Sequence, residues 1–201
     1  MDDRVHFDEV RTMDADPTRK LRADAQDNRD RMLVAARELF AERGLDVGMR
    51  EIARRAAVGP ATLYRRFPTR QTLIDEAFAV ELRSCRAIVE RGAAHPDAWH
   101  GLRGALEELT LLSASNRGFV DAFTATADVS AALTEHRRRL LGMLDGLARR
   151  AKAQGALRAD FVASDLVLVL RAGRAVGSVD ATDSAAAARR FVSLIVDGLR
   201  R

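Results

Sequence analysis

The stretch from Met49 to Phe67, MREIARRAAVGPATLYRRF, decides the fold of this chain. It predicts two short helices joined by a tight turn. Gly48 can cap the first helix, and Glu51 stands where the carboxylate of a capping box would reach back. Gly59 can cap the second helix, with Pro60 at the first helical position, where the missing N–H group costs nothing.

The second helix of this stretch separates an apolar face from a polar one. Leu63 and Phe67 repeat at i, i+4 and are expected to point inward. The side chains expected to face outward are Thr62, Tyr64, Arg65 and Arg66. Such a face suits the groove of a polyanion better than a protein core. We therefore predict a helix-turn-helix motif over residues 49–67, whose second helix enters the DNA major groove by its N-terminal end.

Two segments resemble a known family. Residues 58–74, VGPATLYRRFPTRQTLI, resemble the signature of the tetracycline-repressor (TetR) family of transcriptional regulators. That family commonly shows Val-Ser-x-Gly-Thr-Leu-Tyr-x-His-Phe-Pro-Ser-Lys-Glu before a Leu-rich helix. Residues 31–44, RMLVAARELFAERG, resemble its first helix. The resemblance covers about a quarter to a third of the chain, near the N-terminus, and residues from about 75 onward carry no signature.

The chain departs from the family pattern at a few positions. Glycine stands at positions 48 and 59, where Thr or Ser is usual, and Ala61 replaces Gly. Thr69-Arg70 replaces Ser-Lys, and Arg66 replaces His. All of these except Arg66 keep a capping role, a small size or a positive charge, so Arg66 is the departure that could change which DNA sequence is bound.

The motif and the resemblance together predict a sequence-specific DNA-binding transcriptional regulator. Arg70 lies in the first turn of a helix capped by Thr69, where a DNA phosphate would meet free N–H groups and a guanidinium; the alternative is an exposed arginine without a contact. The predicted DNA-binding residues are Arg50, Gly59, Pro60, Ala61, Thr62, Tyr64, Arg65, Arg66 and Arg70.

The distribution of charge supports a nucleic-acid partner. Residues 19–72 hold thirteen basic and seven acidic side chains, a net charge of +6, whereas residues 1–18 carry −4 and the remainder carries +2. Clustered positive charge is the electrostatic footprint of a DNA-binding protein. Base composition of the genome could explain the preference for arginine over lysine, but it does not explain the clustering.

The composition predicts an all-α fold of nine or ten helices. Nearly half of the 201 residues are hydrophobic, aromatic residues are few, alanine is abundant and no alternating strand pattern stands out. We expect a mobile acidic tail over residues 1–18, a DNA-binding domain over residues 19–75 and a helical effector-binding and dimerisation domain over residues 76–201. Helices are expected to begin near Asp27, at residues 70, 97 and 130, near residue 164 and at Asp183, the one from residue 70 running to about Arg91.

Several further predictions concern single segments. Arg19, Lys20 and Arg22 precede the expected first helix, as an arm that touches phosphate or the minor groove, or as a solvated linker. Arginines 137–139, 149 and 150 are expected to face outward from the helix over residues 130–154. That helix and the apolar one over residues 164–176 are candidates to pair with their symmetry mates as a four-helix bundle, as the resemblance also implies. The alternative is that these apolar faces are buried entirely within one subunit.

The resemblance implies a homodimeric repressor released from its double-stranded DNA operator by a small-molecule ligand. We expect a lipophilic effector, since an apolar pocket in the middle segment would suit one, although each candidate residue could instead belong to the core. The candidate pocket-lining residues are Trp99, His100, Leu102, Leu106, Phe119 and Phe123. The alternative function is a helical small-molecule or protein-binding module without specific DNA readout.

Catalytic chemistry is not predicted. The four histidines form no metal motif, and neither a phosphate-binding glycine loop nor a nucleophile elbow is present, so we expect no metal, no cofactor and no enzymatic activity. Cys85, the single cysteine, has Arg83 and Arg86 nearby, which favours a reactive thiol if it is exposed and a buried small residue otherwise. Without a secretory segment, a disulfide or a membrane-spanning run, a soluble cytoplasmic protein is expected.

Overall fold

The computed structural model describes residues 17–125, 130–176 and 184–201, and within them the chain forms ten α-helices and no strand. An isolated antiparallel bridge joins Leu157 to Arg200. The predicted all-α fold of nine or ten helices is confirmed. The helices are α1 (Pro17–Arg43), α2 (Met49–Arg55), α3 (Pro60–Arg66), α4 (Arg70–Ala77), α5 (Ala79–Ala94), α6 (Ala98–Ser115), α7 (Arg117–Thr124), α8 (Ala131–Ala153), α9 (Asp165–Val176) and α10 (Ser184–Leu199).

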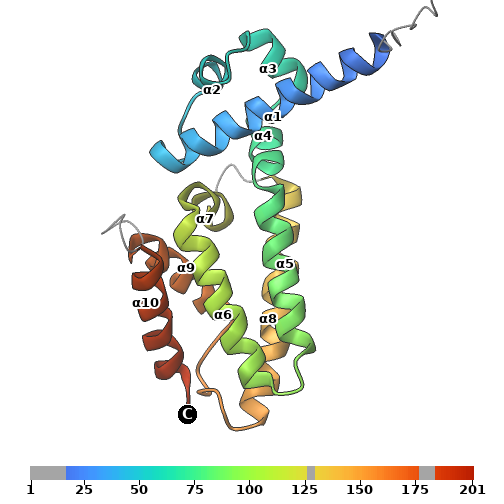
Figure 1. Ribbon diagram of the computed structural model, residues 1–201. Helices are drawn as coiled ribbons and strands as arrows, with labels where there is room; N and C mark the ends of the chain where they lie inside the picture. Colours follow the sequence, from blue (N-terminus) through green and yellow to red (C-terminus); the bar gives the residue numbers. More distant parts are fainter. Residues whose placement is uncertain (1–16, 126–129, 177–183) are drawn as a thin grey trace, which may run out of the picture.

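Helices α1 to α4 form a small unit at one end of the molecule, with α2 and α3 farthest from the long helices (Figure 1). Its core is built from Phe40 of α1, Ile52 of α2 and Leu63 of α3, together with Phe67, which follows α3; all four are fully buried. The inward direction that was expected for Leu63 and Phe67 is therefore confirmed.

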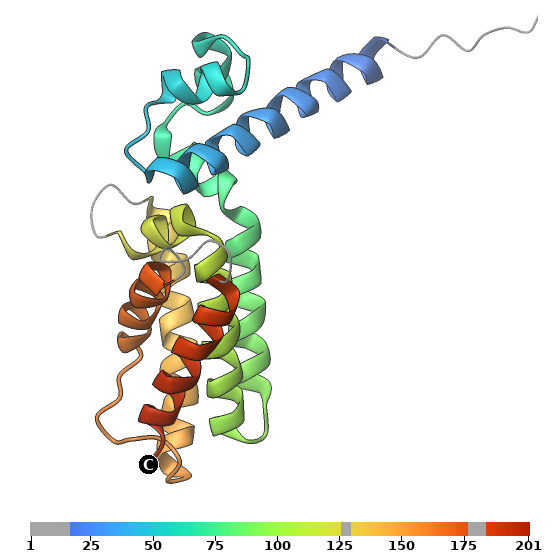
Figure 2. The ribbon, with the colours of Figure 1, turned by 60° about the vertical axis from the view of Figure 1, so that its left-hand side comes forward.

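The first helix begins at Pro17, ten residues before the expected start at Asp27. Figure 2 shows this early part of α1 running out beyond the body of the protein. The residues concerned, PTRKLRADAQ, lack an apolar stripe but contain good helix formers after an N-terminal proline, so propensity alone extends the helix. Arg19, Lys20 and Arg22 thus belong to a helix and not to a linker. Most of the predicted acidic tail, and Asp183, lie outside the described residues.

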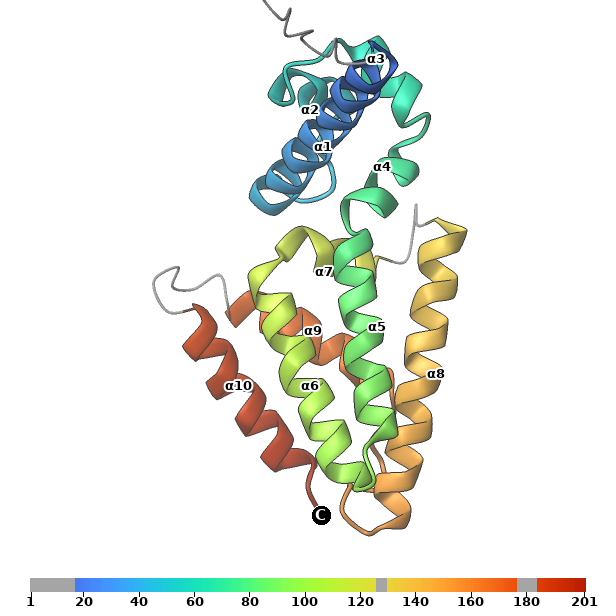
Figure 3. The same cartoon turned by 45° about the vertical axis from the view of Figure 1, so that its right-hand side comes forward.

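Helices α5 to α10 form the larger body. Helix α6 is central and packs against α5, α8, α9 and α10, which enclose it from several sides. Figure 3 shows α5 and α8 along one flank of this body and α10 on the other. The starts expected at residues 97 and 130 agree with the structure. The side chains of Asp97, Asn116 and Ser130 cap α6, α7 and α8, each accepting a hydrogen bond from the first turn of its helix.

The helix expected to run from Arg70 to about Arg91 is divided in two. Phe78, with φ −105° and ψ 13°, lies between α4 and α5. Its buried ring contacts Phe40 of α1 and Phe119 of α7, at centroid distances of 5.9 and 5.8 Å. No proline or glycine marks this break, which is why the sequence pattern indicated one continuous helix.

Two arginines of α8 that were expected to face solvent instead donate hydrogen bonds to the C-terminal ends of other helices. Arg137 Nη1 donates to the carbonyl oxygens of Phe123 and Ala125 at the end of α7 (3.2 and 2.8 Å). Arg150 donates to the carbonyls of Ala93 and His95 at the end of α5 (2.6 and 2.8 Å). The last carbonyls of a helix lack intrahelical partners and carry partial negative charge, so a guanidinium stabilises them.

The small unit and the larger body meet most closely where α7 packs on α1. A Cβ atom added at Gly118 of α7 would lie 2.8 Å from Phe40 Cβ and 2.9 Å from the Phe40 carbonyl carbon. Only a residue without a side chain permits this approach of the two helices. The contact therefore fixes how α1 sits on the body.

We predict that Gly118→Ala lowers the free energy of unfolding by about 1–3 kcal/mol, because the added methyl group must push α1 away from α7. Gly104→Ala is the matched control: a Cβ there meets nothing within 4 Å, so it should be neutral or stabilising by up to about 1 kcal/mol. Chemical denaturation at one fixed protein concentration measures both. Equal effects of the two substitutions would contradict the close packing.

Candidate nucleic-acid interface

The turn between α2 and α3 is closed by backbone hydrogen bonds. The Ala57 N–H donates to Arg54 O (3.1 Å), and the Val58 N–H donates to Ala53 O (3.0 Å). This is the Schellman arrangement, in which the residue after the helix adopts a left-handed conformation. Ala57 takes that position with φ 54°, although glycine is the usual residue there. Because no glycine marks the position, this strain was not predictable from the sequence pattern.

Helix α3 is oriented by what it buries. Gly59 and Pro60 stand at the predicted N-terminal positions, and Leu63 is completely buried. Tyr64, by contrast, is 45% exposed. The outward face also carries Arg65, whose Nη2 donates to Thr62 Oγ1 (3.2 Å), and Arg66, whose guanidinium lies 5.9 Å from the centroid of the Phe67 ring. The structure thus brings the predicted residues of α3 together on one exposed surface.

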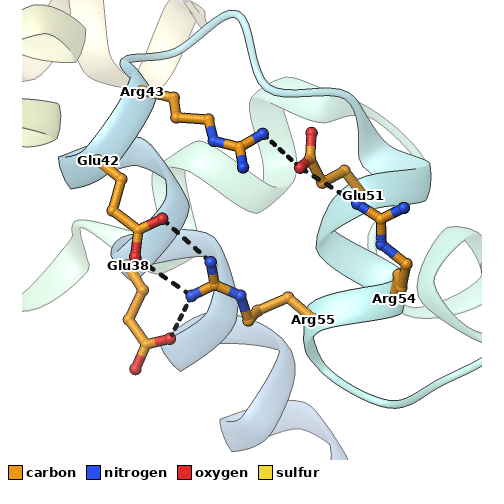
Figure 4. A network of polar contacts seen from close by, with 6 residues as sticks. All are labelled: Glu38, Glu42, Arg43, Glu51, Arg54 and Arg55. Carbon is orange, nitrogen blue, oxygen red and sulfur yellow. Dashed lines mark hydrogen bonds and ion pairs between the residues drawn. The ribbon is translucent and has the colours of Figure 1, made fainter.

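A network of ion pairs fixes α2 against the end of α1 (Figure 4). Arg55 of α2 contacts Glu38 and Glu42 of α1, with N–O distances of 3.2 and 3.0 Å, and its hydrogen bond lowers the pKa of Glu42. Glu51 contacts Arg43 at 2.6 Å and Arg54 at 3.4 Å. The carboxylate expected to reach back in a capping box is therefore used in ion pairs, and Gly48 makes no side-chain cap at the start of α2.

These pairs divide the arginines of the small unit into two groups. Arg43, Arg54 and Arg55 are partly neutralised by carboxylates within the unit. Arg50, Arg65 and Arg66 are exposed, and across the described ranges none of these three forms an ion pair. Part of the uncompensated positive charge of the small unit therefore lies on the outer face of α2 and α3. A surface of this kind attracts the phosphates of a nucleic acid.

Arg70 occupies neither of the environments that were expected for it. Its Nη1 donates to the Val47 carbonyl oxygen (2.6 Å), and the residue is half-buried. Thr69 caps α4 as predicted, its side chain accepting a hydrogen bond from the Thr72 N–H (3.1 Å). Arg70 thus ties the start of α4 to the connection before α2. Only its remaining N–H groups are available for a phosphate.

The structure places the residues predicted to line an effector pocket in two different environments. Five of the six lie in packed core, and these are Trp99, Leu102, Leu106, Phe119 and Phe123. The sixth, His100, is exposed at the start of α6, where its Nδ1 lies 3.0 Å from Asp97 Oδ2. The burial of the apolar residues follows from the central position of α6 and from the contact between the rings of Phe119 and Phe123.

The side chains that could be reactive or could bind a metal ion lie in environments typical of structural residues. Cys85 is buried, and burial raises the pKa of its thiol to about 12, which is the environment of an unreactive small residue. In the part of the chain that the structure describes, no three His, Cys, Asp or Glu side chains are placed to hold a metal ion together. None of the described helices is both long and apolar enough to cross a membrane.

Two family models match the chain. The family described as "Bacterial regulatory proteins, tetR family" matches residues 32–77, which contain α2, α3 and α4. The family described as "Transcriptional regulator SbtR-like, C-terminal domain" matches residues 96–201, more than half of the chain. No curated protein matches.

Solved structures of regulators are similar over most of their length. A TetR transcriptional regulator from Streptomyces coelicolor is 30% identical, with 86% of this chain and 98% of that chain covered and a TM-score of 0.52. PfmR, a TetR family regulator from Thermus thermophilus, is 23% identical (86% and 97% covered, TM-score 0.63). FadR from Bacillus subtilis in complex with stearoyl-CoA is 17% identical (85% and 98% covered, TM-score 0.59). The last two show the fold alone.

We predict that Ala57→Gly raises the free energy of unfolding by about 0.5–1 kcal/mol. Glycine relieves about 1–2 kcal/mol of left-handed strain, and part of that gain is offset by the larger entropy of glycine in the unfolded chain. Ala56→Gly serves as the control, because Ala56 has φ −76° and a buried methyl group, and it should destabilise by about 1 kcal/mol. A melting temperature below that of the wild-type protein for both variants would argue against strain at Ala57.

Proposed function

The chain belongs to the TetR family of bacterial regulatory proteins, and from this membership we propose that it is a homodimeric repressor released from its operator by a small molecule. It is a DNA-binding transcriptional regulator with a helix-turn-helix motif. The mode of regulation, the dimer and the ligand response are the parts that we propose. In the same way we propose residues 19–75 as the DNA-binding domain and residues 76–201 as the effector-binding and dimerisation domain.

The exposed face of α3 is the observation that carries the proposal. Leu63 is completely buried, so the helix is held firmly while Tyr64, Arg65 and Arg66 remain exposed. We assign Tyr64 and Arg66 to base edges and neighbouring backbone, together with Thr62 and Arg65. Gly59, Pro60 and Ala61 form the end of α3 that comes closest to the duplex, and Arg50 and Arg70 contact flanking phosphates.

The short length of α3 favours a regulator that binds DNA as a dimer. One helix of seven residues reads few bases, and regulators of this kind usually bind two half-sites about 34 Å apart through a two-fold dimer. Leu168 of α9 is 64% exposed and Leu194 of α10 is 53% exposed, whereas no large hydrophobic residue of α8 is exposed. We therefore assign the dimer surface to α9, which is the helix expected over residues 164–176, together with α10 in place of the helix over residues 130–154.

The route by which a ligand acts on DNA binding is proposed to pass through α7 and α1. These helices touch at Gly118 and Phe40, so a shift of α7 must displace α1 or be resisted by it. A ligand that favours one arrangement of α7 would change the spacing of the two α3 helices and hence the affinity for an operator. The B. subtilis relative was solved in complex with stearoyl-CoA, and the acyl chain of that ligand is consistent with a lipophilic effector.

We predict that the arginines of α2 and α3 differ in their effect on DNA binding. After selection of bound genomic fragments, Arg50→Ala should weaken binding to all fragments about equally and reduce the slope of log affinity against log salt by about 1. Tyr64→Ala and Arg66→Ala should change the order of preference among fragments, with about 1–3 kcal/mol of lost discrimination.

The control for both is Arg103→Ala, which removes a surface arginine of α6 that is paired with Glu107 and should leave DNA binding unchanged. A uniform loss for every α3 variant would argue against specific readout. If the wild-type protein prefers no genomic fragment over unrelated DNA, the alternative of a helical small-molecule or protein-binding module would stand instead.

We predict that a charge placed on the proposed dimer surface separates the subunits. Leu168→Glu and Leu194→Glu should each weaken dimerisation by at least about 2 kcal/mol, because a carboxylate would be buried without a partner. Val80→Glu is the matched control, since Val80 of α5 is similarly exposed but lies outside this surface. Sedimentation velocity across a concentration series measures the effect, and dimers that survive both substitutions on α9 and α10 would contradict the assignment.

A further inference from the structure

Helices α5 and α8 run side by side on the flank of the body opposite α10 (Figures 1 and 3). Side chains of both helices line a groove. Its volume is about 520 Å³. Leu140 and Met143 of α8 contribute apolar surface, and His136 stands beside them on the same helix. This groove contains none of the residues that the sequence predicted for an effector pocket.

The charged side chains of the groove are already paired with one another. Arg86 Nε lies 2.7 Å from Glu90 Oε1 on α5, and Arg139 Nε lies 2.6 Å from Glu135 Oε1 on α8. Hydrogen bonds from Arg138 and Arg139 lower the pKa of Glu135 to about 2, so the carboxylate is ionised at neutral pH. The four charges sum to zero and each has a partner. An anionic ligand would have to displace a carboxylate, which favours a neutral ligand.

His136 has a ring nitrogen that is left without a hydrogen bond in the described part of the chain. Its Nε2 is buried, and none of the described residues forms a hydrogen bond with it. The ring also hydrogen-bonds to the backbone of Leu82 on α5. Because Nε2 is the atom without a partner, we assign this bond to Nδ1. Burial, reinforced by the charges of Arg86 and Arg139, lowers the pKa of His136 and keeps the ring neutral. With the proton on Nδ1, Nε2 is a hydrogen-bond acceptor that lacks a donor, and burying such an atom destabilises the protein.

We propose that this groove binds neutral, largely apolar compounds that carry a hydroxyl group, with the hydroxyl donating to Nε2 of His136. The ligand reaches this atom by displacing side chains at the rim of the groove, where the guanidiniums of Arg86 and Arg139 are exposed. The apolar part of the ligand lies against Leu140 and Met143. The assignment of this groove as the effector site rests on the proposed function.

The position of the groove links it to the small unit. His136 also borders a hollow that Asp75 of α4 helps to line. Ser130, at the start of α8, donates to Asp75 Oδ1 (2.8 Å) and so joins α8 to α4. A ligand hydrogen-bonded to His136 therefore contacts α8, the helix that is joined to α4 by the Ser130–Asp75 hydrogen bond.

Three ligands that share one ring system test the chemical class. The probes are 2-naphthol, naphthalene and 2-naphthoate, measured by equilibrium dialysis against the full-length protein. 2-Naphthol should bind at least about tenfold more tightly than naphthalene, because its hydroxyl pairs with the buried acceptor. 2-Naphthoate should bind more weakly than 2-naphthol. Equal affinity for naphthol and naphthalene, tightest binding of the anion, or no saturable binding of 2-naphthol up to millimolar concentration would each overturn the proposal.

Two substitutions place the ligand in the groove. His136→Phe keeps a ring but removes the acceptor, so the preference for 2-naphthol over naphthalene should disappear while naphthalene still binds. The same variant should melt at a higher temperature than the wild-type protein, because it removes an unsatisfied buried atom. A retained preference for 2-naphthol in this variant would overturn the role of Nε2.

Gly142 of α8 also lines the groove, and a Cβ atom there would meet nothing within 4 Å. Gly142→Leu should therefore fill the groove without disturbing the fold and reduce 2-naphthol affinity at least about tenfold, whereas Gly142→Ala should reduce it much less. Equal binding by all three proteins would place the ligand elsewhere. These measurements need no operator, so their failure would leave DNA binding by α3 untouched, and a failure of DNA binding would leave them interpretable.

Discussion

Helix α3 has seven residues, and a helix of that length is not stable by itself in water. Its existence depends on Leu63 and Phe67, which are completely buried in the small unit. The same burial fixes the rotation of α3 about its own axis, and that rotation decides which side chains face outward. The exposed surface of Tyr64, Arg65 and Arg66 is therefore a consequence of two apolar contacts on the opposite side of the helix.

Arginine serves three distinct purposes in this chain. On α2 and the end of α1 it forms ion pairs that hold helices together, as Arg55 does with Glu38 and Glu42. On α8 it covers the last carbonyls of α5 and α7, through Arg150 and Arg137. On the outer face of α3 it stays exposed. A composition biased toward arginine explains why this residue was used, but only the positions of its partners separate the structural arginines from those that can meet DNA.

The sequence predicted the helix-turn-helix motif well, because its signals are local. Pro60 at the start of α3 and the spacing of Leu63 and Phe67 each act within one or two turns. The break at Phe78 and the inward direction of Arg137 were not predictable in this way, since both depend on contacts with a separate helix, α7, whose position no local pattern sets. The candidate pocket residues stay a prediction, because an apolar pattern predicts burial but does not distinguish the wall of a cavity from the interior of a core.

The break at Phe78 has a mechanical consequence. Helix α4 moves with the small unit and α5 with the larger body, so a rotation between them can be absorbed by the backbone angles of one residue while both helices keep their hydrogen bonds. The Phe78 ring, however, is in contact with Phe40 on one side and Phe119 on the other. Any bending of this joint must slide one aromatic ring over its neighbours, which makes the joint stiff and confines it to a few discrete angles.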